Sequence, residues 1–93
     1  MSADDKIELL GFNSDILLKG KTFHVQTEIF AVPRPSTIRT SVYHRGYLIK
    51  KISFDCSDLM NAPDAEERLK EKVKKQHFQA VSALKDGAFP VDD

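Results

Sequence analysis

The stretch TFHVQTEIFA, residues Thr22–Ala31, constrains the fold of this chain more than any other segment. In a β-strand, successive side chains point to opposite sides of the sheet, and the β-branched content here suits a central strand. One side would carry the apolar members of the segment, and the other would carry a mixed set: His24, Gln26, Glu28 and Phe30. The sequence therefore predicts a sheet with one apolar face and one face of mixed character.

The segment before it, residues 12–19, alternates in the same way and predicts a preceding strand. Gly20-Lys21 suits a two-residue hairpin loop of type II′, which favours glycine at its first central position. That loop fixes the register. The apolar pairs then expected are Leu18 opposite Phe23, Ile16 opposite Val25 and Phe12 opposite Ile29.

A second hairpin is predicted further along the chain. Pro33 and Pro35 end the central strand near Val32, and alternation resumes over residues 37–44. His44-Arg45-Gly46 suits a three-residue loop, whereas a two-residue loop would turn Leu48, Ile52 and Phe54 toward the polar face. The longer loop leaves Lys50 facing inward, which an edge strand tolerates.

A helix of about 20 residues follows, because apolar residues then recur at helical spacing. Pro63 lies near its start, Asp64 and Glu67 are spaced as a capping box, and Gly87 supplies a stop. The expected core stripe consists of Leu69, Val73, Ala80 and Leu84. The predicted fold class is α+β, a four-stranded antiparallel β-meander with one C-terminal helix packed on one face (ββββα). We expect an N-terminal tail over residues 1–11, a single domain over 12–86 and a frayed C-terminal tail over 87–93.

Composition narrows the classes of function. The 14 basic residues balance the 14 acidic residues, so no overall charge directs the protein to nucleic acid or an anionic membrane. No apolar run reaches the roughly 20 residues that span a bilayer, and the acidic start of the chain is unlike a secretory signal. The single cysteine, Cys56, cannot form an intramolecular disulfide and fits a reducing compartment, so we expect a cytoplasmic protein without membrane contact.

The sheet face that the helix leaves uncovered is expected to bind a partner protein. Tyrosine and arginine are enriched at interface cores, and large apolar patches are uncommon on monomers. The predicted partner-binding residues are His24, Gln26, Glu28, Phe30, Arg39, Tyr43, Tyr47 and Ile49. Two alternatives remain: the segment Ile7–Leu10 folds over this face, or these residues are scattered singly without a role.

A second contact is expected at Phe78, which lies opposite the core stripe on the helix. A partner, or a second copy of the chain, would cover it. The alternative is that the C-terminal half of the helix is buried on two sides, which Val81 would also fit.

The sequence predicts no catalytic residue, no metal site and no cofactor. The three histidines and Cys56 lack the spacing of a metal site. His24 and Glu28 are four residues apart, about 13 Å on an extended strand, which is too far for joint acid–base chemistry. Glu28 is expected opposite Ser41 in a polar network, and Cys56 as a buried small hydrophobic residue.

Single-stranded nucleic-acid binding is the alternative function. The second hairpin is basic and carries two tyrosines that could stack on bases. The residues concerned are Arg34, Arg39, Arg45, Lys50 and Lys51, with Tyr43 and Tyr47. The helix lysines alternate with glutamates at i,i+4 spacing, which is typical of a solvated helix face.

The chain also resembles a group of short bacterial proteins, chiefly deltaproteobacterial, for which no activity is established. The resemblance rests on Phe12-Asn13-x-Asp15-Ile16, on the FHVQTE run from Phe23 to Glu28, and more weakly on Gln76-His77 and Leu84-x-x-Gly87-x-Phe89. It implies that His24, Gln26 and Glu28 belong to the distinguishing motif of the group. Pro33 and Pro35 stand where the group would have a glycine-containing connection. Taken together, we expect a small interaction or adaptor module that binds itself, as a homodimer, or another protein.

Overall fold

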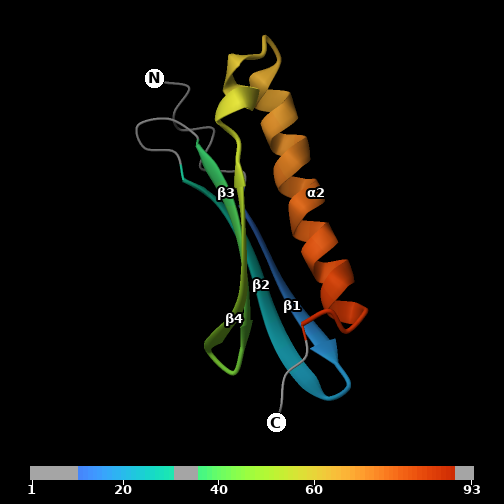
Figure 1. The fold of residues 1–93 in the computed structure, drawn as a ribbon. Coiled ribbons are helices and arrows are strands. Elements are labelled where there is room, and N and C mark those ends of the chain that lie inside the picture. Colours follow the sequence, from blue (N-terminus) through green and yellow to red (C-terminus); the bar gives the residue numbers. More distant parts are fainter. Residues whose placement is uncertain (1–10, 31–35, 90–93) are drawn as a thin grey trace.

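The computed structural model of the protein describes residues 11–30 and 36–89. Four antiparallel strands form one open sheet in the order β1-β2-β3-β4, and a long helix follows (Figure 1). The strands are β1 (Phe12–Leu18), β2 (Lys21–Phe30), β3 (Thr37–His44) and β4 (Tyr47–Asp55). The short 3-10 helix η2 (Ser57–Asn61) leads into α2 (Ala65–Lys85). The predicted ββββα fold is confirmed.

The first hairpin turns one residue earlier than predicted. Leu18 pairs with Lys21, so the loop is Lys19-Gly20, and both loop residues have positive φ, 53° and 79°. Positive φ at both positions is the signature of a type I′ turn, not of the predicted type II′ turn. Ile16 therefore faces Phe23, and Phe12 faces Thr27. The register differs by two residues from the prediction, so every side chain still keeps its predicted face.

The second hairpin also closes with a two-residue loop, Arg45-Gly46, where φ is 54° and 83°. The predicted three-residue loop was wrong. A β-bulge then shifts the register, since Tyr43 faces Leu48 whereas Val42 faces Lys50, leaving Ile49 as the extra residue. The bulge returns Ile52 and Phe54 to the helix side, which is why a two-residue loop is compatible with the apolar pattern.

The helix packs on the sheet face that carries Phe23, Val25 and Val42, and Ala80, Val81 and Leu84 complete that part of the core. A second apolar cluster contains Ile38, Cys56, Leu69 and Val73. All four residues of the predicted stripe are buried. Cys56 is buried too, as predicted, and burial raises the pKa of its thiol.

The helix N-terminus does not contain the predicted capping box. Asp64 is the N-cap residue but makes no side-chain cap hydrogen bond. Its carboxylate instead accepts a hydrogen bond of 2.7 Å from Arg68 Nε, and that bond lowers the pKa of Asp64. At i,i+4 spacing, the aspartate satisfies arginine rather than the first amides of the helix.

A layer of buried polar side chains separates the two apolar clusters. Both ring nitrogens of His77 are hydrogen bonded: Nε2 lies 2.8 Å from Ser14 Oγ, and Nδ1 lies 2.8 Å from Thr27 Oγ1. Thr27 Oγ1 lies 2.7 Å from Thr40 Oγ1, to which Gln76 Nε2 donates at 3.2 Å. These contacts fit one direction of hydrogen-bond donation: Gln76 donates to Thr40, Thr40 to Thr27, Thr27 to His77, and His77 to Ser14. In this arrangement the proton of His77 is on Nε2. This network ties α2 to β1, β2 and β3.

Several sequence-based expectations concern residues outside the described ranges. These are the folding of Ile7–Leu10 over the open sheet, the shape of the connection containing Pro33 and Pro35, and the end of the C-terminal tail beyond residue 89. Phe89, which the sequence placed in that tail, packs against the core cluster of Phe23 and Leu84.

Candidate partner-binding face

The sheet face turned away from α2, here called the open face, displays cross-strand rows of side chains. One row runs Asp15, His24, Tyr43, Leu48, and the next runs Asn13, Gln26, Ser41, Lys51. A third joins Glu28, Arg39 and Ser53. Directly opposed residues on neighbouring strands are about 5 Å apart, so each row is one continuous surface across the sheet.

His24 is fixed in orientation by Asp15. Its Nδ1 lies 2.8 Å from Asp15 Oδ1, and the His24 ring is tilted against Tyr43 with centroids 6.2 Å apart. In the neutral tautomer that donates its Nδ1–H to this carboxylate, Nε2 is left to accept a hydrogen bond from a ligand. The side chains stay accessible, with 41% of His24 and 77% of Asp15 exposed. This pair therefore presents an oriented hydrogen-bonding group to a partner.

Arg39 forms the other organised part of the open face. Its guanidinium lies 4.2 Å from the centroid of the Phe30 ring, a cation–π contact. Its Nε atom is buried and has no hydrogen-bond partner among the described residues. Glu28 stands opposite Arg39, so the predicted pairing of Glu28 with Ser41 was wrong, and Gln26 takes that place. The register difference of two residues again preserves the face.

Exposed apolar side chains lie around these polar groups. Leu17 is 73% exposed, Leu48 is 50% exposed and Phe30 is 38% exposed. Ser41, at the centre of the sheet, is only 4% exposed although it belongs to the same face. The open face therefore has one buried hydroxyl side chain at its centre, accessible polar side chains around it and apolar residues toward its margins.

Two predicted members of this face lie elsewhere. Tyr47 pairs with His44, whose ring stacks on Phe23 at 4.7 Å, so Tyr47 belongs to the helix side of the sheet. Ile49 is the bulged residue and packs against the core cluster. The bulge changes the alternation, and it puts Leu48 on the open face instead. Reading Arg45-Gly46 as a type I′ turn would have found Leu48 from the sequence.

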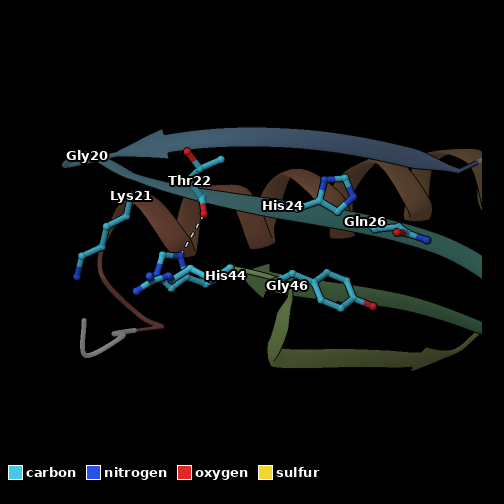
Figure 2. A pocket seen from close by; sticks show the side chains of 9 residues that line it. Gly20, Lys21, Thr22, His24, Gln26, His44 and Gly46 are labelled. Carbon is cyan, nitrogen blue, oxygen red and sulfur yellow. Dashed lines mark hydrogen bonds between the residues drawn. The ribbon is translucent and has the colours of Figure 1, made fainter.

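The remaining predicted residues are brought together as expected. His24, Gln26, Glu28 and Phe30 lie on one face of β2, with Arg39 and Tyr43 on the same face of β3. A shallow pocket lies at one end of this face, between the two hairpin turns, and Figure 2 shows His24 and Gln26 beside it. His44 also lines the pocket, and its Nδ1 donates a hydrogen bond of 3.1 Å to the Thr22 carbonyl oxygen.

Phe78 is 48% exposed on α2, as the sequence predicted. It is not isolated, because its ring meets the edge of the Phe12 ring with centroids 6.0 Å apart. Val81, the other apolar helix residue outside the predicted core stripe, is buried, so of these two residues only Phe78 is exposed. Phe78 thus overhangs β1.

The basic hairpin residues are divided between the two sides of the sheet. Arg39 and Lys51 belong to the open face, whereas Lys50 faces the helix side, with its Nζ 6.0 Å from the centroid of Phe89. Tyr43 and Tyr47 occupy opposite faces as well. The hairpin therefore offers no single surface that combines both tyrosines with all the basic groups.

The described residues contain no group of three or more His, Cys, Asp or Glu side chains arranged for a metal ion. Within the same ranges, no helix has the length and apolar character needed to cross a membrane. The predictions that the protein is not an enzyme and uses no cofactor stay predictions.

Comparisons with known proteins give no further guidance. No protein-family model, no curated protein and no solved structure matches this chain. The resemblance to short deltaproteobacterial proteins stays a prediction, and the functional argument rests on the geometry of the open face.

Proposed function

We propose that this protein is a small interaction module that binds a partner protein through the open face of its sheet. The observation that supports the proposal is the distribution of exposed apolar groups. Leu17, Phe30 and Leu48 lie on the one sheet face that α2 does not cover. Burying such groups is favourable by about 25 cal/mol for each Å² of apolar surface.

Specificity in this proposal comes from the polar groups between the apolar ones. Asp15 orients His24, and Phe30 supports Arg39, so both groups are held before a partner arrives. Preorganised side chains lose less conformational entropy on binding. We place this activity in the cytoplasm, because the chain has one cysteine and that cysteine is buried.

Nucleic-acid binding is less well supported. The tyrosines that would stack on bases lie on opposite faces, and the open face also carries Asp15, Glu28 and Asp55. Carboxylates repel a phosphate backbone. Binding of single-stranded nucleic acid that falls steeply with added salt would nevertheless favour that alternative.

Affinity capture from a lysate of the source organism tests the proposal with two adjacent substitutions. Leu48→Asp places a charge on the open face, whereas Tyr47→Asp places the same charge on the neighbouring residue, which is 76% exposed on the helix side. The wild-type protein and Y47D should retain the same bound proteins, and L48D should lose them. A bound protein that L48D retains as well as Y47D does would place the binding surface elsewhere.

A further inference from the structure

The two edges of the sheet differ in their protection against pairing with another strand. β4 carries a bulge and two lysines, Lys50 and Lys51, with Lys50 turned inward. Bulges, lysines and inward charges are the usual means by which proteins block an edge. β1 has seven residues, FNSDILL, without lysine, proline or bulge. Among the described strands, β1 pairs only with β2. The edge of β1 is therefore the one suited to accept a strand.

The register of the first hairpin shows which backbone groups β1 offers. A two-residue loop closes on a hydrogen-bonded pair, here Leu18 with Lys21, and hydrogen-bonded pairs then alternate along the strands. The amides of the even-numbered residues of β1 therefore face β2. Those of Asn13, Asp15 and Leu17 face away from β2, and no other described strand pairs with them, so a second strand can reach them.

We propose that β1 pairs antiparallel with β1 of a second copy of this chain, about a two-fold axis at Ser14. An axis perpendicular to the sheet always places one residue opposite itself. With Ser14 on the axis, Asn13 faces Asp15 of the other copy, and the side-chain amide of Asn13 can donate a hydrogen bond to the Asp15 carboxylate. Phe12 faces Ile16 of the other copy. An axis at Asp15 would oppose two carboxylates, and an axis at Ile16 would oppose Asp15 with Leu17. Ser14 gives the most complementary pairing.

The helix supports the same axis independently. His77 is hydrogen bonded to Ser14 at 2.8 Å, and the next residue, Phe78, overhangs β1 in contact with Phe12. The two helices would run antiparallel on the same side of the joined sheet, with the two copies of Phe78 nearest the axis. Glu71 and Lys85 lie seven residues to either side of Phe78 and so share its helix face. Glu71 of one copy would then approach Lys85 of the other, and the two charges are opposite. This dimer does not depend on the proposed function, because it leaves both open faces uncovered.

A single-cysteine series tests the axis directly. In a Cys56→Ala background, Ser14→Cys should form a covalent dimer under mild oxidation. The amide of Ser14 faces β2, so the two copies of residue 14 would form a non-hydrogen-bonded pair. The Cα atoms of such a pair are about 4.5 Å apart, within the range of a disulfide. Asp15→Cys and Ile16→Cys should remain mostly monomeric under the same conditions. A covalent dimer formed more readily by D15C or I16C, or by none of the three variants, would overturn the proposed axis.

Molar mass by light scattering tests the interface without cross-linking. The wild-type protein should approach twice its monomer mass of 10.5 kDa. Asn13→Pro removes the outward backbone N–H and the side-chain carboxamide of Asn13 but no backbone hydrogen bond to β2, so it should give a folded monomer. Glu71→Lys should weaken the dimer about tenfold, because it turns two symmetry-related attractive pairs at the surface into repulsive ones. The double variant E71K/K85E restores opposite charges in both pairs and should restore the dimer.

Leu48→Asp is the control that separates this dimer from the open-face function, and it should leave the mass unchanged. A wild-type monomer at about 0.1 mM would overturn the dimer while leaving the open-face proposal intact. A dimer that L48D dissociates but N13P does not would assign self-association to the open face.

Discussion

At the scale of single residues, the unexpected feature is a histidine at the centre of the core. His77 is fully buried, and burial lowers its pKa because the charged imidazolium would lose its hydration. On the helix it stands in a run of lysines, glutamine and glutamates that looks like a solvated face. The sequence could not distinguish Gln76 and His77 from that face. Their burial follows from Ser14, Thr27 and Thr40, which are distant in sequence and supply the hydrogen bonds.

The lowered pKa of His77 predicts that acid destabilises the fold. The unfolded chain binds a proton as the pH falls through about 6.5, whereas folded His77 resists protonation, so the free energy of unfolding decreases from that pH downward. The decrease ends once the pH passes the lower pKa of the folded state. Urea denaturation between pH 7.5 and pH 5 measures this, with the range set by the ordinary histidine pKa of about 6.5.

The matched variants for this experiment are His77→Gln and His24→Gln. H77Q should flatten the acid dependence, since its side chain does not titrate. H24Q makes the same substitution at an exposed histidine of the open face and leaves the hydrogen bonds of His77 in place, so the loss of acid dependence should be specific to H77Q. Equal acid dependence in wild type and H77Q would show that other groups control acid stability.

Thr27→Val should destabilise the protein by about 1–3 kcal/mol, because valine keeps the shape but deprives His77 Nδ1 and the Thr40 hydroxyl of their hydrogen bond to Thr27. Thr22→Val is the control, since Thr22 is an exposed neighbour on the same strand. That change should stay within about 0.5 kcal/mol. Chemical denaturation compares the two variants, and equal effects would mean that the Thr27 hydroxyl contributes nothing specific.

At the scale of elements, alternation of apolar and polar residues was sufficient to predict four strands, their order and the helix. The exact pairing was not predictable, because both turns place a long basic residue, Lys19 or Arg45, in the left-handed conformation that glycine normally supplies. The preference for glycine at the first position led to the wrong loop in the first hairpin. In the second hairpin, no residue type in β4 indicates the bulge at Ile49. Tyr47 and Ile49 were assigned to the wrong face for that reason.

The turn geometry predicts that Lys19→Asn stabilises the protein by about 0.5 kcal/mol, because asparagine tolerates positive φ better than lysine. Gly20→Ala should destabilise it by about 1–2 kcal/mol. An added Cβ at Gly20 meets no atom within 4 Å, so this cost is backbone strain alone. Thermal denaturation of both variants measures the effects, and a stabilising G20A would contradict the type I′ assignment.

At the scale of the whole molecule, one helix serves a sheet with two faces. α2 and the polar network secure one face, while the other keeps an oriented histidine, a supported arginine and three exposed apolar residues. The sequence correctly placed six of the eight predicted residues on this face, since a register error of two residues preserves the alternation: His24, Gln26, Glu28, Phe30, Arg39 and Tyr43. The identity of the partner could not be predicted from the sequence, because the alternation of side chains specifies which residues share a surface and not what binds to it.

Side-chain footprinting by hydroxyl radicals tests most directly whether a component of the cell lysate occupies the open face. The oxidation rate of Tyr43 and Leu48 would be compared between purified protein and the same protein in lysate, with Tyr47 as the internal reference on the opposite side of the hairpin. Our account predicts that the lysate protects Tyr43 and Leu48 while Tyr47 reacts at an unchanged rate. Equal rates for all three residues in the two conditions would contradict it.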